Sequence, residues 1–324
     1  MTFPSWFVLL TLLIPAVVFL LLPYMTPRRY FFGITVAPDF FDSAPGRAIR
    51  RGYMIAVGVG VAIAIGLAYA IPPAGPAFAI AAPAIAGMIG FYHARHLAAQ
   101  HATVVSPIRE ADLSPAPDRL PLWGLLALPP IAALAAAWFY LRAHWDEIPV
   151  RFPVHWDWNG QPNGWANKTP MGVFGDLYIG GAGLLFIALL GIGMVYGSRR
   201  TPFRTGVLKI LLGTMYMMAY VIVAVALLPL HRIGPSGLLV PIVVSVVAIL
   251  AYSFKLAADP DSGTDPTPDS CWYWSQIYYN PADPAIFVQR RVGIGYTLNL
   301  GNRLSWIVMA VPLVTIAALL LVLR

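Results

Sequence analysis

The sequence predicts an all-α polytopic membrane protein with a small lobe that contains a β-hairpin. Of its 324 residues, 59% are hydrophobic and only 11% are charged, whereas a typical soluble domain carries about 25% charged residues. Apolar runs of about 18 residues or more recur along the chain, and a run of that length can cross a bilayer as a helix. Two polar segments, 142–172 and 258–303, interrupt these runs.

About eight apolar stretches are long enough to span a membrane. The first, MTFPSWFVLLTLLIPAVVFLLLPY, lacks the basic region that precedes the apolar core of a cleaved signal peptide, so we interpret it as a span. Prolines inside several stretches are compatible with membrane helices, which bend at them. The predicted spans are residues 5–24, 52–71, 74–93, 121–141, 174–196, 206–229, 237–257 and 304–323.

The distribution of Lys and Arg predicts the orientation of these spans. With the N-terminus outside, sixteen of the 21 basic residues fall on inner loops and five on outer ones. Because inner loops are enriched in Lys and Arg, both termini and the 142–172 loop are predicted to be extracytoplasmic. The same rule accounts for the formal net charge of +7, so we expect the lipid bilayer as partner and no nucleic acid.

This orientation divides the chain into a membrane domain, 1–257, which carries the extracytoplasmic loop, a cytoplasmic linker and small lobe, 258–303, and a last transmembrane helix, 304–324. In the lobe, AIFVQRR and YTLNL are β-prone runs separated by VGIG, which predicts a hairpin. YYNPADP is typical of a turn. Candidate contacts of a cytoplasmic regulator lie here: Tyr278, Tyr279, Asn280, Asp283, Arg290 and Arg291.

Two further segments are expected near lipid headgroups. PRRYFFGITVAPDFF, after the first span, is predicted to lie at the interface with Arg28 and Arg29 near anionic lipid. The histidines of FYHARHLAAQH are expected to meet headgroups, with a metal-ligand role as the weaker alternative. The single cysteine, Cys271, excludes an intrachain disulfide and a multi-cysteine metal site, and no cofactor is predicted.

The outer loop contains the tripeptide His-Trp-Asp twice. One interpretation is a metal site or a His–Asp acid–base pair, because imidazole and carboxylate groups bind zinc when they converge. Its side chains would be His144, Asp146, His155 and Asp157. The other interpretation, favoured by the lack of a metal-ligand spacing motif, is that the tryptophans anchor the loop at the headgroup level.

The second tripeptide continues into WNGQPNGW, whose Asn-Gly pairs and proline favour tight turns. Such turns would hold Trp156, Trp158 and Trp165 in a defined arrangement, and well-packed aromatic side chains dominate many binding surfaces. The loop is therefore a candidate peptide-binding surface. Its candidate residues are His155, Trp156, Asp157, Trp158, Asn159, Gly160, Pro162, Gly164, Trp165 and Lys168.

The stretch VHWDWNGQPNGWANKT resembles the signature loop of SdpI-like bacterial membrane proteins, which reads roughly Ile-Pro, His-aromatic-Asn, then Gly-x-Pro-Asp-Gly-x-x-Ser-Lys. This sequence departs from it at Asp157 (usually Asn), Asn163 (usually Asp) and Asn167 (usually Ser). PRRYFFGITV is similar to the first cytoplasmic loop of such proteins, and YYNPADPAIFVQRR with GIGYTLNLGN looks like an uncharacterised domain often appended to them. The matching loop residues are Ile148, Pro149, His155, Trp156, Gly160, Pro162, Gly164, Trp165 and Lys168.

The resemblance implies little chemistry at the loop. Its best-known members confer immunity to a secreted peptide toxin and sequester a transcriptional regulator at the membrane. We therefore expect a multi-pass protein of a bacterial inner membrane and, as its first function, a non-enzymatic sensor or immunity-type protein whose outer loop binds a peptide or envelope ligand. The alternatives are a transporter or carrier of a lipid-like or peptide substrate, and an envelope enzyme that uses zinc or His155 with Asp157. No ionisable residue lies near the middle of a predicted span, which disfavours a proton-coupled pump.

Overall fold

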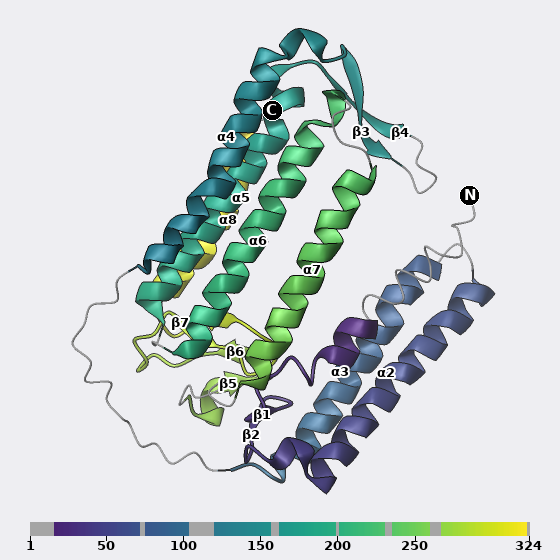
Figure 1. Cartoon of the computed structure of the whole chain (residues 1–324). Helices are drawn as coiled ribbons and strands as arrows, with labels where there is room; N and C mark the ends of the chain where they lie inside the picture. The colour runs from purple at the N-terminus through teal and green to yellow at the C-terminus, as the bar shows by residue number, and fades with distance from the viewer. Residues whose placement is uncertain are drawn as a thin grey trace. The chain divides into compact units, whose positions relative to one another are not determined.

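A computed structural model of the chain describes residues 16–71, 75–103, 120–156, 162–198, 201–230, 235–259 and 267–322. Helices dominate, and two-stranded hairpins supply the remaining regular structure (Figure 1). The predicted fold class, an all-α polytopic membrane protein with a small β lobe, is confirmed. The helices are α2 (Ala44–Ala70), α3 (Gly75–Ala99), α4 (Leu128–Ala143), α5 (Pro170–Gly197), α6 (Pro202–Ala226), α7 (Pro235–Ala258) and α8 (Arg303–Val322).

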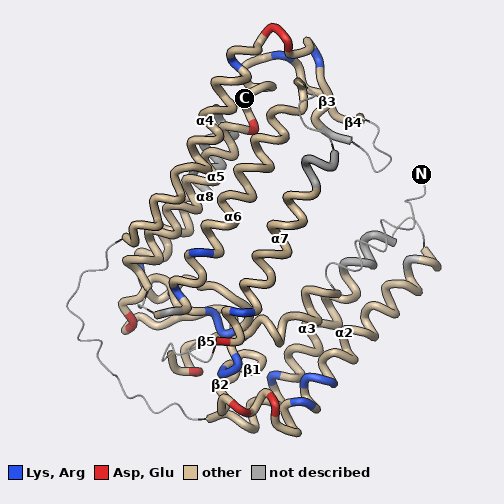
Figure 2. The backbone as a smooth tube through the Cα atoms, viewed as in Figure 1, with Lys and Arg blue, Asp and Glu red and all other residues tan. Residues whose placement is uncertain are grey.

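The helices correspond closely to the predicted spans. Within the described residues, five segments are long and apolar enough to cross a membrane: Ala44–Leu67, Leu122–Ala143, Pro170–Gly197, Phe203–Ala226 and Val240–Ala258. The predicted spans 74–93 and 304–323 are also helical, in α3 and α8, whereas most of 5–24 falls outside the described residues. Most Lys and Arg lie toward helix ends and in connecting segments (Figure 2).

The start of α2 differs from the prediction, because the helix begins at Ala44 rather than at residue 52. Ser43 caps it, since its hydroxyl accepts a hydrogen bond from the backbone N–H of Gly46 at 3.1 Å. A proline in the first turn adds to this start, because the N–H that it lacks would have no partner within the helix. Polar helix-start signals therefore extend this helix beyond its apolar run.

The chain forms two compact units. Unit 1 comprises Met1–Asp112, Ser253–Pro284 and Val288–Gly301, and unit 2 comprises Leu113–Tyr252, Ala285–Phe287 and Asn302–Arg324. In unit 1, α2 and α3 pack through small residues: a Cβ added at Gly60 would lie 2.5 Å from Cβ of Ala86. Glycine therefore allows the two helix backbones to approach closely.

The segment predicted to lie near lipid headgroups has most of its aromatic side chains buried in unit 1. Strands β1 (Tyr30–Phe31) and β2 (Ile34–Thr35) form an antiparallel hairpin whose turn includes Gly33 at φ 79°. Their side chains join a buried aromatic cluster with Tyr53 of α2 and Phe91 of α3. Edge-to-face ring contacts hold this cluster together, so these aromatic residues stabilise the core of unit 1.

The lobe contains four short strands, β5 (Trp272–Tyr273), β6 (Ile277–Tyr278), β7 (Phe287–Gln289) and β8 (Tyr296–Leu298). The predicted hairpin is confirmed, because β7 pairs with β8. The predicted turn in YYNPADP is confirmed as well, since the N–H of Asp283 donates to the carbonyl of Asn280 at 3.2 Å.

In unit 2, α4, α5 and α6 pack against one another (Figure 1). Glycines of α5 face α6: a Cβ at Gly180 would lie 2.4 Å from Cδ1 of Ile222, and one at Gly183 would lie 2.6 Å from Cε of Met218. The core of this unit continues to the end where α4 and α5 are joined, through Leu141, Phe152 and Phe174. That end carries the predicted outer loop.

Candidate ligand-binding surface

The outer loop folds as a β-hairpin. Strand β3 (Arg151–Trp156) pairs antiparallel with β4 (Pro162–Asn167), and Phe152 lies opposite Ala166. The register shifts after Pro153, so that Val154 is an extra residue between the pairs Pro153–Trp165 and His155–Gly164. Such a bulge increases the local twist and redirects the side chains beside it.

One face of the hairpin is anchored in the core of unit 2. Phe152 is only 3% exposed and Ile148, just before the strand, only 2%. Both belong to the cluster that contains Leu141 of α4 and Phe174 of α5. The ring of Trp145, in the 3₁₀ turn Trp145–Glu147, stacks on Phe174 with centroids 5.8 Å apart. The hairpin is therefore packed against α4 and α5 through its buried side chains.

The junction between the hairpin and α5 is tight. The N–H of Lys168 donates to the carbonyl of Val150 at 2.8 Å, which closes the base of the hairpin. Thr169 then caps α5 by accepting from the N–H of Gly172 at 3.0 Å. A Cβ at Gly172 would lie 2.2 Å from the carbonyl oxygen of Asn167, so only glycine allows this close approach.

The opposite side of the hairpin is exposed and carries an arginine against a tryptophan. The indole of Trp165 is 48% exposed, and Cζ of Arg151 lies 5.1 Å from its ring centroid. At the base, Nζ of Lys168 lies 5.5 Å from the ring of Trp145. Val150 and Val154 add exposed apolar side chains. Cation–π pairs at exposed sites contribute only about 0.5–1 kcal/mol, but this pair fixes the position of an indole that remains half exposed.

The metal-site interpretation depends on His144, Asp146, His155 and Asp157. Nδ1 of His144 lies 2.8 Å from the carbonyl oxygen of Tyr140, and the two rings stack. This histidine therefore ends α4 through local contacts. Across the described ranges, no group of three His, Cys, Asp or Glu side chains could hold a metal ion.

Part of the predicted site lies outside the described residues, namely Asp157, Trp158, Asn159 and Gly160. For His155 and Trp156 the structure gives strand pairing, with Gly164 and Pro162 respectively. The described candidates that the structure brings together are Pro162, Gly164 and Trp165 on β4 and Lys168 at the junction.

The second candidate surface, in the lobe, surrounds a buried arginine. Arg291 is 1% exposed and forms an ion pair with Asp269. Its guanidinium also donates to the carbonyls of Thr267 and Gly33 and lies between the rings of Tyr30 and Trp272, about 5 Å from each centroid. Thr35 donates to the same carboxylate at 2.8 Å. This arginine joins the lobe to the N-terminal hairpin inside unit 1.

A hydrogen-bond network also buries other predicted contact residues. The hydroxyl of Tyr278 donates to Asp283 at 2.9 Å, and Asn280 donates to that hydroxyl at 3.1 Å. The amide of Asn299 donates to the carbonyls of Asn280 and Asp283. Burial raises the pKa of Tyr278 above its usual value, so its hydroxyl remains a donor at physiological pH. Of the predicted contact residues, the accessible ones are Tyr279, which is exposed, and Asn280 and Arg290, which are partly exposed.

Two parts of the chain match families of unknown function. Residues 131–175 match a domain of unknown function (DUF1648) found in membrane proteins, and residues 281–306 match a family of unknown function (DUF5808). The first match covers most of α4, the whole hairpin and the start of α5, and the second covers β7, β8 and the start of α8. No curated protein and no solved structure matches the chain.

Sequence reasoning missed several residues that form or support the surface, namely Val150, Arg151, Phe152, Val154 and Gly172. A signal for the strand is present in VRFPVHW, where Arg151 and Phe152 alternate between exposed and buried positions. A proline within such a run disfavours a strand, yet Pro153 lies beside the bulge, where the ladder is interrupted.

Proposed function

We propose that this chain is a non-enzymatic sensor or immunity-type protein of the bacterial inner membrane, which binds a peptide or another envelope ligand through the β3–β4 hairpin. The observation that carries the proposal is the exposed Trp165–Arg151 pair on a hairpin whose other face is anchored by Phe152. Trp and Arg are enriched among residues that dominate binding energy, provided that they are held in place. The resemblance of the loop to SdpI-like proteins supports the same function.

An extended peptide fits this surface better than a compact, globular ligand does. In the part of the chain that the structure describes, β3 and β4 form a two-stranded sheet with no third strand. Open strand edges carry backbone groups that can pair with an added strand, while side chains beside them select the sequence. A peptide paired along the hairpin could stack an apolar or aromatic side chain on Trp165 and place a carboxylate near Arg151.

Helix α5 reaches from the binding surface to Ile286 and Phe287, which belong to the same unit. Its 28 residues correspond to about 42 Å at about 1.5 Å per residue, which is close to the thickness of a bilayer with its headgroups. At the end distant from the hairpin, the carbonyl of Gly197 accepts from the N–H of Ile286 at 2.8 Å. A Cβ at Gly193 would lie 3.2 Å from the ring of Phe287. A shift of α5 caused by binding would therefore act directly on Ile286 and on Phe287, the first residue of β7.

The experiment uses purified full-length protein in nanodiscs, panned against a displayed random peptide library. Selected peptides are then titrated against the wild type, Trp165→Ala and Arg151→Ala, with Leu189→Ala as the control on an exposed position of α5. We expect the affinity to fall at least about tenfold for Trp165→Ala, which corresponds to about 1.4 kcal/mol, and to be unchanged for the control. Peptides that bind Trp165→Ala as tightly as the wild type would exclude the hairpin as the recognition surface.

Coupling is measured separately by hydrogen exchange. Addition of a selected peptide should change the exchange rate of the amides at Ile286 and Phe287 in the wild type. In Trp165→Ala the same peptide should leave both rates unchanged. If the peptide binds without any change at these amides, binding at the hairpin is not transmitted through α5.

A further inference from the structure

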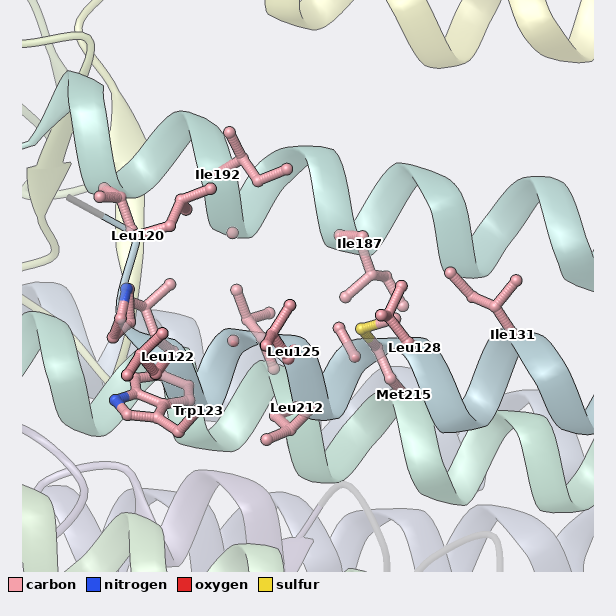
Figure 3. Close-up of a pocket in the computed structure, with 18 residues that line it drawn as sticks. Leu120, Leu122, Trp123, Leu125, Leu128, Ile131, Ile187, Ile192, Leu212 and Met215 are labelled. Atoms are coloured by element: carbon pink, nitrogen blue, oxygen red, sulfur yellow. The ribbon is translucent and has the colours of Figure 1, made fainter.

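Unit 2 contains an apolar groove between α4, α5 and α6, distinct from the hairpin surface. Its volume is about 320 Å³, and its walls include the 3₁₀ segment Leu122–Ala127 that precedes α4. Figure 3 shows the lining side chains in rows along the helices, with Leu120 and Trp123 toward one end and Ile131 toward the other. The middle is lined by Leu125, Ile187, Leu212 and Met215.

The apolar lining of the groove favours binding of a hydrocarbon chain. Its lining residues are almost entirely aliphatic, and a space with few polar partners holds water poorly. All three helices belong to segments that are long and apolar enough to span a membrane. In a bilayer, the molecules that surround these helices are lipid acyl chains, which match the lining in polarity.

The length of the groove is close to the hydrocarbon thickness of one bilayer leaflet. Along α5 the lining runs from Ile187 to Val195, and along α6 from Leu208 to Met215. At about 1.5 Å per residue, each of these stretches covers roughly 10–12 Å. Half of a hydrocarbon core of about 30 Å is about 15 Å, so the groove covers most of the depth that one acyl chain occupies.

One end of the groove has the features of a headgroup region. Trp123 lies at that end (Figure 3), and tryptophan is enriched where helices meet the membrane–water interface. Lys209 follows the lining residue Leu208 and is exposed. The buried Arg204 donates to the carbonyls of Val195 and Ser198 at 2.9 and 3.1 Å, just beyond the same end. The other end, near Ile131, points along α4 toward its middle and is aliphatic.

We propose that the groove is a binding site for one acyl chain of an anionic phospholipid, whose phosphate lies near Lys209 and Trp123. The apolar lining holds the chain, and the basic end fixes its direction. This site is independent of peptide recognition at the hairpin. It would make a single lipid a structural component of the α4–α5–α6 bundle, with a longer residence time than the surrounding lipids.

The test uses substitutions on α5 whose larger side chains fill the groove without disturbing the helix. A Cβ at Gly191 would lie 3.8 Å from Leu208 Cδ2, an ordinary contact, so the first carbon of Gly191→Leu is accommodated and the rest projects into the groove. Ala188→Phe fills the same space from the preceding turn of α5. The matched control is Gly58→Leu on α2, where a Cβ meets nothing within 4 Å.

Full-length protein is equilibrated with phosphatidylcholine vesicles that contain a minor fraction of phosphatidylglycerol, then extracted in mild detergent and analysed by native mass spectrometry. We expect the wild type and Gly58→Leu to retain one phosphatidylglycerol. Gly191→Leu and Ala188→Phe should lose it, with occupancy reduced at least about tenfold, while remaining helical by circular dichroism. Lys209→Gln should reduce the preference for phosphatidylglycerol over phosphatidylcholine.

Three outcomes would overturn the proposal. The wild type could retain no lipid, or both filled variants could retain as much lipid as the wild type. The groove could also bind a second copy of the chain, in which case Leu125→Cys protein would form disulfide-linked dimers through position 125 in vesicles, in a Cys271→Ser background. Because none of these measurements involves a peptide, failure here is distinguishable from failure of the hairpin as a recognition surface.

Discussion

The hairpin of unit 2 and the lobe of unit 1 both place an arginine against aromatic rings, but they do so in opposite environments. In the lobe, Arg291 is 1% exposed and lies between Tyr30 and Trp272. In the hairpin, Arg151 is exposed and lies against Trp165, which is itself half exposed. The same pair of residue types therefore stabilises the fold in one region and presents a surface in the other. Burial, rather than residue type, separates the two roles.

The largest effect is expected from Arg291→Ala. This change removes a buried cation, so the carbonyls of Thr267 and Gly33 lose the guanidinium donor. The carboxylate of Asp269 keeps its hydrogen bond from Thr35 but loses its ion pair. Loss of one partner of a buried pair costs about 3–5 kcal/mol, and the lower end applies because Asp269 is 42% exposed. Thermal unfolding in detergent measures the loss.

The matched control for Arg291→Ala is Arg28→Ala. Arg28 also pairs with a carboxylate, Asp42, but both side chains are more than half exposed. Exposed pairs contribute about 0–1 kcal/mol. Equal losses of stability in the two variants would contradict the structural role assigned to Arg291.

Phe152→Ala should come next, because it removes the anchored side of the hairpin. The cavity left among Leu141, Ile148 and Phe174 should lower the free energy of unfolding by about 3 kcal/mol. Binding of the selected peptides should fall as well, since the exposed face would lose its support. A variant that keeps full peptide affinity would show that the recognition surface does not depend on this anchor.

Tyr278→Phe should have a smaller effect that depends on pH. It removes hydrogen bonds to Asp283 and Asn280, worth about 1 kcal/mol at neutral pH. Burial raises the pKa of Tyr278 in the folded protein, so the unfolded chain ionises first, near its usual pKa of about 10. The wild type should therefore lose stability above about pH 10, and the variant should lose less. Identical alkaline denaturation profiles would count against this network.

Trp165→Ala should have the smallest effect on stability and a large effect on binding. Its indole is 48% exposed, and its contact with Arg151 contributes only about 0.5–1 kcal/mol. The unfolding temperature should therefore change little, while the affinity for selected peptides falls at least about tenfold. A large drop in unfolding temperature would instead place Trp165 with the structural residues.

The helices could be predicted from run length alone, because a membrane span needs only a sufficient apolar stretch. The start of α2 could not, since it depends on a serine cap and a proline rather than on hydropathy. The loop could be located, and its tryptophans singled out, from its turn residues. Its strand pairing was missed because Pro153 lies beside a bulge that only the folded ladder reveals.

In the lobe, the secondary-structure elements were easier to predict than the accessibility of the candidate contact residues. Its hairpin and turn follow local sequence preferences and were predicted. The burial of Arg291 depends on Tyr30 and Gly33, which are far away in the sequence. An arginine next to another arginine resembles a solvent-exposed pair until those tertiary contacts form. Asn299, which bonds Asn280 and Asp283, was missed for the same reason.

The proposed function depends on the orientation predicted from the Lys and Arg distribution, in which the hairpin faces the outside of the cell and the lobe faces the cytoplasm. Single cysteines are introduced as Val150→Cys, at a position 80% exposed, and as Tyr279→Cys, at one 47% exposed, in a Cys271→Ser background. Intact cells are treated with a membrane-impermeant maleimide and compared with lysed cells. The account predicts labelling at position 150 in intact cells and at position 279 only after lysis. Equal labelling of both positions in intact cells would contradict it.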